Sequence, residues 1–407
     1  MIAGIEVNHN LSAVAGVRVA AVESSIRYKN RLDLVLFEFA PCSRVAGVFT
    51  RNAFCAAPVM LAKKHLESSG GECRYLLINT GNANAGTGEK GLRDALACCE
   101  ALAQATGVPV NSVLPFSTGV IGENLPVEKI ALGIPKAVSA LADSNWSEAA
   151  KGIMTTDTRP KSASATMNVG GQTVTITGIA KGAGMIKPNM ATMLSFIATD
   201  ALIEQALLQK LLEGAVQRSF NRITVDGDTS TNDACILAAS GSSAVTISEA
   251  DAASYQLFNT ALQGLLLELA QSIIRDAEGA KKFVTVDVRE GGNSGECLMV
   301  AYAIAESPLV KTALSASDPN WGRILAAVGR AGVPDLDVSR INISLGEVSI
   351  VENGTLAPSY TEAAGQAVMN QGDIDIIVRL ARGSAQERVW TSDLSEEYVR
   401  INASYRS

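Results

Sequence analysis

The chain has 407 residues, of which 47% are hydrophobic and 18% are charged, and its formal net charge at pH 7 is −7. This composition can bury a large core and excludes disorder as the main state. The acidic balance argues against a nucleic-acid backbone as the main partner. We expect no membrane helix and no signal peptide, because no apolar run reaches about 18 residues and the first ten residues lack a basic flank and an apolar stretch.

Cysteine and histidine usage narrows the chemistry further. The seven cysteines include no Cys-x-x-Cys pair, which indicates a reduced, cytoplasmic protein without a disulfide frame or a structural zinc. The two histidines are His9, in a polar stretch, and His65, which follows Lys63 and Lys64 on a predicted helix. We expect both to be exposed on the surface. A Ser-His-Asp triad or a histidine-rich metal site is therefore unexpected, and an enzyme with this sequence should use another base.

Short apolar segments alternate with glycine-containing turns along the chain. The helix expected at 90–106 places Leu92, Leu96, Cys99 and Leu102 on one face. Two alternating strands flank Gly170-Gly171 and predict a hairpin. We expect strands at 75–79, 166–169, 173–179, 192–199, 222–225, 283–288, 341–351 and 375–380. We also expect a helix capped by Asp200 that runs through 202–215, and an amphipathic helix at 251–276. This mixed order favours an α+β fold or a layered sandwich over a strict βαβ repeat.

Two glycine- or aspartate-rich motifs suggest ligand binding only weakly. Gly86-Thr-Gly-Glu-Lys-Gly91 matches G-x-G-x-x-G before a helix, but a loop separates it from the preceding strand, so an ordinary glycine-rich loop is favoured. Asp226-Gly-Asp228 follows a strand and could hold Mg²⁺, but a polar turn is favoured there. A non-enzymatic nucleotide or metal binder remains an alternative.

The segment 181–200 carries the most information. Glycines at 182 and 184 allow unusual backbone angles, Pro188 stiffens the approach, and Thr192 opens an apolar strand. The Thr192 hydroxyl could attack the carbonyl of Ala191, and hydrolysis of the resulting ester would release Thr192 as a new N-terminus. Its α-amine could then act as the base for its own hydroxyl, without histidine. From spacing alone, a threonine that merely opens a strand is the favoured interpretation.

Several blocks in the same order resemble the ornithine acetyltransferase family, the bifunctional glutamate N-acetyltransferases of arginine biosynthesis. Besides 181–200, these blocks are 79–86, 117–122, 154–158, 224–233, 277–279, 318–323 and 401–407. The resemblance implies autocatalytic cleavage between Ala191 and Thr192 into an α chain, 1–191, and a β chain, 192–407. It also implies an α+β layered sandwich, similar to self-cleaving DmpA-like aminopeptidases, and a heterotetramer of two α and two β chains.

The resemblance further implies an acyltransferase. Thr192 would take acetyl from N²-acetylornithine and pass it to glutamate in a ping-pong reaction, without a metal or a resident cofactor. Acetyl-CoA is a second donor in some members, and the sequence leaves its use here open.

Residue roles follow from the same resemblance. Thr118 and Gly119 match an oxyanion pair. The matching substrate contacts are Thr155, Lys181, Thr192, Glu278, Asn402 and Ser407. A lysine suits the carboxylate of an amino acid and a glutamate suits its amine, although Lys181 and Glu278 could instead form a structural ion pair. The sequence departs from the family at Ser407, where threonine is common, and at Ala277, where glycine is expected and an added methyl could shift Glu278.

An aminopeptidase or amidase with an N-terminal nucleophile is the alternative enzyme. It would share the cleavage and the nucleophile but pass the acyl group to water. Lys181, Glu278 and Asn402 favour an amino-acid acceptor instead.

Overall fold

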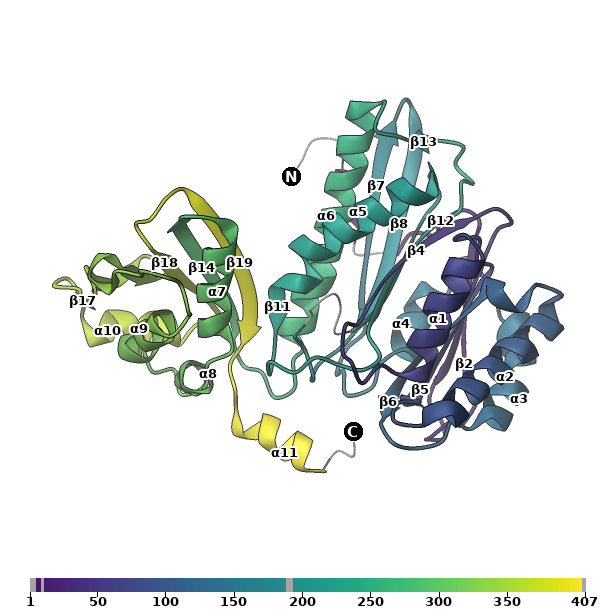
Figure 1. Cartoon of the computed structure of the whole chain (residues 1–407), viewed down its shortest axis with the longest axis horizontal. Helices are drawn as coiled ribbons and strands as arrows, with labels where there is room; N and C mark the ends of the chain where they lie inside the picture. The colour runs from purple at the N-terminus through teal and green to yellow at the C-terminus, as the bar shows by residue number, and fades with distance from the viewer. Residues whose placement is uncertain (1–4, 9–10, 188–192, 405–407) are drawn as a thin grey trace.

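The computed structural model describes residues 5–8, 11–187 and 193–404, and the part of the chain before β14 (Phe283–Gly291) is built around two facing sheets (Figure 1). A four-stranded sheet has the order β2-β3-β5-β6, and a six-stranded sheet has the order β1-β7-β8-β9-β12-β4. The bounds are β1 Ile5–Asn8, β2 Val17–Val22, β3 Leu34–Phe39, β4 Arg44–Phe49, β5 Tyr75–Asn82, β6 Val113–Val120, β7 Lys161–Val169, β8 Gln172–Lys181, β9 Leu194–Thr199 and β12 Ala234–Ala239. The predicted hairpin is confirmed, since β7 and β8 pair in antiparallel fashion through Val169 and Gln172.

Aromatic side chains fill the space between the two sheets. Phe37 and Phe116 of one sheet contact Phe196 of the other, with ring centroids 5.6 and 5.1 Å apart. Helices cover both outer faces: α2 (Gly88–Thr106) and α3 (Val127–Ser139) on the four-stranded sheet, and α5 (Gln205–Arg218) and α6 (Ala252–Arg275) on the six-stranded sheet. The result is a four-layered α/β/β/α sandwich, which confirms the predicted layered α+β class.

By length and composition alone, helix α6 is long and apolar enough to cross a membrane. The sequence expectation of no membrane helix rested on unbroken apolar runs, and the apolar residues of α6 are interrupted by polar ones. Half of its apolar window is buried, and the helix packs on β7 and β8. The bent pair of α7 (Ser294–Ala305) and α8 (Pro308–Ser315) passes the same test only if it is counted as one span. In α6, the apolar residues therefore belong to the core of the sandwich.

The C-terminal part forms a second core around a seven-stranded sheet of order β11-β19-β14-β18-β15-β16-β17. The strands are β11 Ile223–Thr224, β14 Phe283–Gly291, β15 Asn342–Leu345, β16 Val348–Glu352, β17 Thr355–Leu356, β18 Asp373–Arg379 and β19 Ala385–Ser392, and α7, α8, α9 (Trp321–Gly329) and α10 (Glu362–Met369) accompany them. After β19 the chain leaves this sheet, and α11 (Glu396–Ser404) extends back toward the sandwich (Figure 1).

The prediction that Asp200 caps a helix is wrong. Its carboxylate accepts a hydrogen bond from the Thr175 backbone N–H at 2.9 Å. The apolar pair at 202–203 instead forms β10 (Leu202–Ile203), which pairs with β13 (Thr246–Ile247). Helix α5 begins only at Gln205, with Glu204 as its N-cap.

The prediction that His65 is exposed is also wrong. His65 lies on α1 (Ala57–Ser68) and is buried, with Nδ1 2.8 Å from the carbonyl oxygen of Val113. Helical periodicity explains the error, because Lys63 and Lys64 point to solvent while Leu61 and His65 share the inward face. His9 lies outside the described residues.

The sheet order bears on the predicted division at 191/192, although the boundary itself lies outside the described residues. Strand β9 pairs with β8 on one side and with β12 on the other, and β12 pairs with β4. Chains 1–191 and 192–407 would therefore share one continuous sheet. The division stays a prediction, and the sheet explains how two such chains would remain associated.

Candidate active site

Six of the predicted site residues line one cavity of about 120 Å³ at an end of the sandwich. They are Thr118, Gly119, Thr155, Lys181, Glu278 and Asn402. They come from the ends of β6 and β8, from the loops after α4 (Trp146–Gly152) and α6, and from α11. Met193, the residue after the predicted nucleophile, also lines the cavity. Ala191, Thr192 and Ser407 lie outside the described residues.

The end of β6 presents the predicted oxyanion pair. Gly119 lies beside Gly81 of β5, and its φ is +134°, a conformation that disfavours any side chain. A Cβ at Gly119 would lie 2.4 Å from the backbone carbon of Gly81, so only glycine fits. The Lys181 ammonium donates to Thr118 Oγ at 3.3 Å. Because lysine can only donate, the Thr118 hydroxyl proton remains available to point elsewhere.

A buried carboxylate, Asp157, ties two cavity segments together. Its Oδ2 accepts from the Thr155 N–H at 2.9 Å and its Oδ1 accepts from the Gly182 N–H at 2.7 Å. Burial alone would raise the pKa of the Asp157 carboxyl, but the ammonium groups of Lys181 and Lys161 lower it to about 2. Burial lowers the pKa of the Lys181 ammonium, and the charge of Asp157 opposes that shift.

Lys161 connects Asp157 to a second buried carboxylate, Asp276. Its Nζ lies 2.6 Å from Asp157 and 2.6 Å from Asp276, and all three side chains are buried. Asp276 also accepts from the Thr158 backbone N–H, and it precedes Glu278 by two residues. The network therefore fixes the loop of Thr155 against the loop of Glu278. Sequence reasoning assigned none of these three residues a role.

Glu278 reaches the cavity between the segment of Lys181 and α11. Its Oε2 accepts from Asn402 Nδ2 at 2.8 Å, and its backbone N–H donates to the carbonyl of Ala183 at 2.9 Å. A Cβ at Gly184 would lie 2.5 Å from the Glu278 carboxylate, so the glycine leaves room for it. Ala277 has no positive φ and is buried in the core, so its methyl group is accommodated with Glu278 in the cavity. Lys181 and Glu278 form no ion pair within 4.0 Å in the described part of the chain.

The aspartate motif that suggested a metal site has a structural role instead. The Asp226 carboxylate accepts from the N–H groups of Met185 and Ile186, at 2.6 and 2.9 Å, and lies 3.1 Å from the Tyr398 hydroxyl. It thus holds the loop before the predicted cleavage site and α11 together. Across 5–8, 11–187 and 193–404, no three His, Cys, Asp or Glu side chains are grouped to hold a metal ion.

The glycine-rich motif packs on its own loop. A Cβ at Gly91 would lie 1.9 Å from Thr87 Oγ, and Asn84 Nδ2 donates to the Gly91 carbonyl at 2.9 Å. This arrangement agrees with the favoured interpretation as an ordinary glycine-rich loop.

Comparison with known proteins decides the family. The chain matches the ArgJ family over residues 18–407. The chain belongs to the ArgJ family. The resemblance seen in the sequence is thereby confirmed.

Among similar ArgJ proteins, the arginine biosynthesis bifunctional protein of Pseudomonas syringae pv. tomato is 56% identical over 398 residues, covering 98% of each chain. That of Methylococcus capsulatus is 55% identical over 397 residues, covering 98% of this chain and 97% of the relative. A crystal structure of the ArgJ protein from Bacillus halodurans is 38% identical, covers 51% of this chain and 96% of that chain, and aligns with a TM-score of 0.48.

Proposed function

We propose that this ArgJ protein is a self-processing acetyltransferase that moves acetyl from N²-acetylornithine to glutamate through an ester on Thr192. The observation that carries the proposal is the convergence of Thr118, Gly119, Thr155, Lys181, Glu278 and Asn402, from five separate chain segments, on one cavity beside Met193. Full-length relatives named as arginine biosynthesis bifunctional proteins support the same reaction.

In the first half-reaction, the Thr192 hydroxyl attacks the acetyl carbonyl of N²-acetylornithine, and its proton passes to the neutral α-amine of Thr192. The tetrahedral oxygen then lies near the Thr118 hydroxyl and the Gly119 N–H. The contact from Lys181 supports this role, because it occupies an acceptor position of Thr118 Oγ and leaves the hydroxyl proton for the oxyanion. The C–N bond breaks, ornithine leaves with the proton, and acetyl remains as the ester.

In the second half-reaction, the neutral glutamate amine attacks the ester carbonyl, the ester C–O bond breaks, and the proton lost by the amine passes through the Thr192 α-amine to the Thr192 hydroxyl oxygen. Lys181 is placed for the carboxylate that both amino acids carry, and Glu278, held by Asn402, is placed for an amine. The Glu278 carboxylate can accept hydrogen bonds from the ammonium group of the bound substrate. This ammonium must lose a proton before the amine can attack the ester. No metal or resident cofactor is required by this sequence of steps, and we propose none.

The aminopeptidase or amidase alternative would use the same nucleophile and pass the acetyl or acyl group to water. The identity of 55–56% to arginine biosynthesis proteins, over nearly their full lengths, supports acetyl transfer instead. We further propose acetyl-CoA as a second donor, a cytoplasmic location and an assembly of two α and two β chains.

The deciding assay measures transfer from N²-acetylornithine to glutamate, with acetyl-CoA as a parallel donor and a water-only reaction as the control. We expect N-acetylglutamate to form much faster than acetate. Thr118→Val removes the hydroxyl at nearly constant volume, and loss of one oxyanion donor should lower kcat about 100- to 1000-fold. Acetate as the main product would establish the hydrolase instead.

A further inference from the structure

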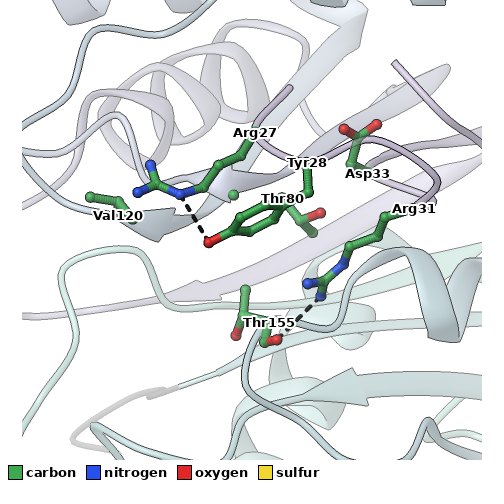
Figure 2. Close-up of a pocket in the computed structure, with 8 residues that line it drawn as sticks. Arg27, Tyr28, Arg31, Asp33, Thr80, Val120 and Thr155 are labelled. Atoms are coloured by element: carbon green, nitrogen blue, oxygen red, sulfur yellow. Dashed lines mark hydrogen bonds between the residues drawn. The ribbon is translucent and has the colours of Figure 1, made fainter. Parts of the chain in front are cut away.

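A second cavity, of about 280 Å³, adjoins the candidate active site (Figure 2). Its wall includes Thr80 and Gly81 of β5, which pair with Thr118 and Gly119 of β6 in the first cavity. Thr155 lines both cavities. The two cavities therefore share Thr155 and are lined by the paired ends of β5 and β6.

Two arginines from one loop line this second cavity. Figure 2 shows Arg27 and Arg31 approaching it from the loop between β2 and β3, with Thr155 across from Arg31. Arg31 Nη2 donates to the carbonyl oxygens of Met154 and Thr155, at 2.5 and 3.2 Å. In the described residues no carboxylate lies within 4.0 Å of its guanidinium. Main-chain carbonyls orient this charge without neutralising it.

Arg27 is held in place separately. Its Nη1 pairs with Glu123 at 2.7 Å, and its Nε donates to the Tyr28 hydroxyl at 3.3 Å. A Cβ at Gly81 would lie 2.8 Å from Arg27 Cβ, so a glycine at this position lets the arginine cross the end of β5. Asp33 also lines this cavity, but both of its oxygens accept from loop N–H groups. Glu123 is the one carboxylate that pairs directly with Arg27 or Arg31 in the described residues, and the two guanidinium groups retain donors for another anion.

The loop that presents the arginines is built around a buried carboxylate. Asp33 accepts from the N–H groups of Ser24 and Ile26, at 2.7 and 2.6 Å. Burial raises the pKa of the Asp33 carboxyl, and these two hydrogen bonds oppose the shift. Because both Asp33 oxygens are bonded to the loop backbone, the loop geometry is fixed before any ligand binds.

We propose that Arg27 and Arg31 form an anion subsite for a substrate bound at the neighbouring active site. The subsite takes an oxyanion, either the γ-carboxylate of the glutamate acceptor or a phosphate of acetyl-CoA. Guanidinium groups suit both, because their planar fork matches carboxylate and phosphate oxygens. The inference rests on the proposed acetyl transfer. It adds a binding site for an oxyanion that glutamate and acetyl-CoA carry and ornithine lacks.

The test compares three reactions of the full, processed protein. Exchange of acetyl between N²-acetylornithine and isotope-labelled ornithine involves neither a γ-carboxylate nor a phosphate. Transfer from N²-acetylornithine to glutamate adds the carboxylate, and transfer from acetyl-CoA to glutamate adds the phosphates. Absence of all three reactions in the wild-type protein would refute the proposed function itself.

We expect Arg31→Gln and Arg27→Gln each to change the ratio of these reactions, since loss of a charge-assisted hydrogen bond weakens binding about tenfold to a hundredfold. A rise of that size in KM for glutamate, with either donor, assigns the subsite to the γ-carboxylate. A rise in KM for acetyl-CoA alone assigns it to phosphate. Arg31→Lys should recover part of the loss.

The matched control is Arg93→Gln, an exposed arginine on α2 that pairs with Glu89. It should leave all three reactions at wild-type values. Arg27→Gln is the more decisive variant, because Arg31 also bonds the Thr155 carbonyl and could act through that contact. Unchanged KM values in Arg27→Gln and Arg31→Gln would overturn the proposal, as would an equal loss of the ornithine exchange reaction.

Discussion

Asp157→Asn is the substitution that most directly tests how the active site is held. The variant keeps the size of the side chain and an acceptor for the Thr155 N–H, but it removes the negative charge between Lys161 and Lys181. Lys161 keeps its contact with Asp276 at 2.6 Å. The change therefore removes the charge of Asp157 together with the acceptor for the Gly182 N–H, while the shape of the side chain is kept.

The lowered pKa sets the expected loss of stability. The folded protein lowers the pKa of the Asp157 carboxyl from its ordinary 3.8 to about 2. At about 1.4 kcal/mol per pKa unit, the charged form adds about 2 kcal/mol to the free energy of unfolding at neutral pH. Because the folded pKa is the lower one, this contribution is present above about pH 4 and is lost as the pH falls toward 2. Removing one partner of a buried ion pair costs roughly 3–5 kcal/mol when no other partner remains.

The activity should change through Lys181. Burial lowers the pKa of its ammonium and Asp157 opposes this, so Asp157→Asn should lower that pKa further. Lys181 must be charged to bind a carboxylate, so the alkaline limb of kcat/KM should move to lower pH in this variant.

The assay combines pH–rate profiles with denaturant unfolding. Asp251→Asn is the control, because it replaces an exposed N-cap with a residue that caps equally well. If Asp157→Asn loses stability but keeps the wild-type alkaline limb, Asp157 acts only in folding and our account of Lys181 fails.

Three further predictions concern the nucleophile. The purified protein should consist of chains 1–191 and 192–407, and Thr192→Ala should remain one inactive chain; intact mass spectrometry of a fully active single chain would contradict this. Steady-state kinetics should give parallel double-reciprocal lines and an acetyl adduct on the second chain, whereas intersecting lines without an adduct would favour direct transfer. The acidic limb of kcat/KM should follow an N-terminal amine, at about pH 7–8 before any local shift, because the amine must be neutral to accept the hydroxyl proton. His65→Gln removes the imidazole that contacts the Val113 carbonyl and should leave the acidic limb of kcat/KM unchanged. Loss of the acidic limb in this variant would identify histidine as the base instead.

Much of the sandwich was predictable because its elements have strong local patterns. The turn at Gly170-Gly171 and the helix at 90–106 are signals within a few residues, and the structure confirms the turn and the helix. The predicted apolar face is confirmed in part, because Cys99 and Leu102 are buried while Leu92 and Leu96 are only half-buried. Asp200 shows the limit of such signals. An aspartate before an apolar run looks like a helix cap, but its partner is the N–H of Thr175, on a strand 25 residues earlier.

The individual site residues were predictable from the family motifs, whereas their supports were not. Thr118, Lys181 and Glu278 stand in the motif blocks that carry the family resemblance, and the structure brings them to one cavity. Asp157 lies in such a block too, but its role depends on Lys161 and on a carboxylate 115 residues beyond that lysine. No local pattern indicates that three charges will be buried together, because an isolated buried charge is strongly unfavourable until its partners are present.

Asp226 shows that one local sequence pattern is compatible with two different roles, of which the structure shows one. In sequence, two aspartates separated by a glycine suit a cation site, although a polar turn is the favoured interpretation. In the structure, the partners of Asp226 are backbone N–H groups 41 and 40 residues away and a tyrosine hydroxyl 172 residues away. Those contacts join the loop before the predicted cleavage site to the helix that carries Asn402. The position of Asn402 beside Glu278 therefore depends on the same carboxylate that holds the loop leading to the nucleophile, and the two halves of the proposed site are coupled through a residue that lies outside the cavity lining.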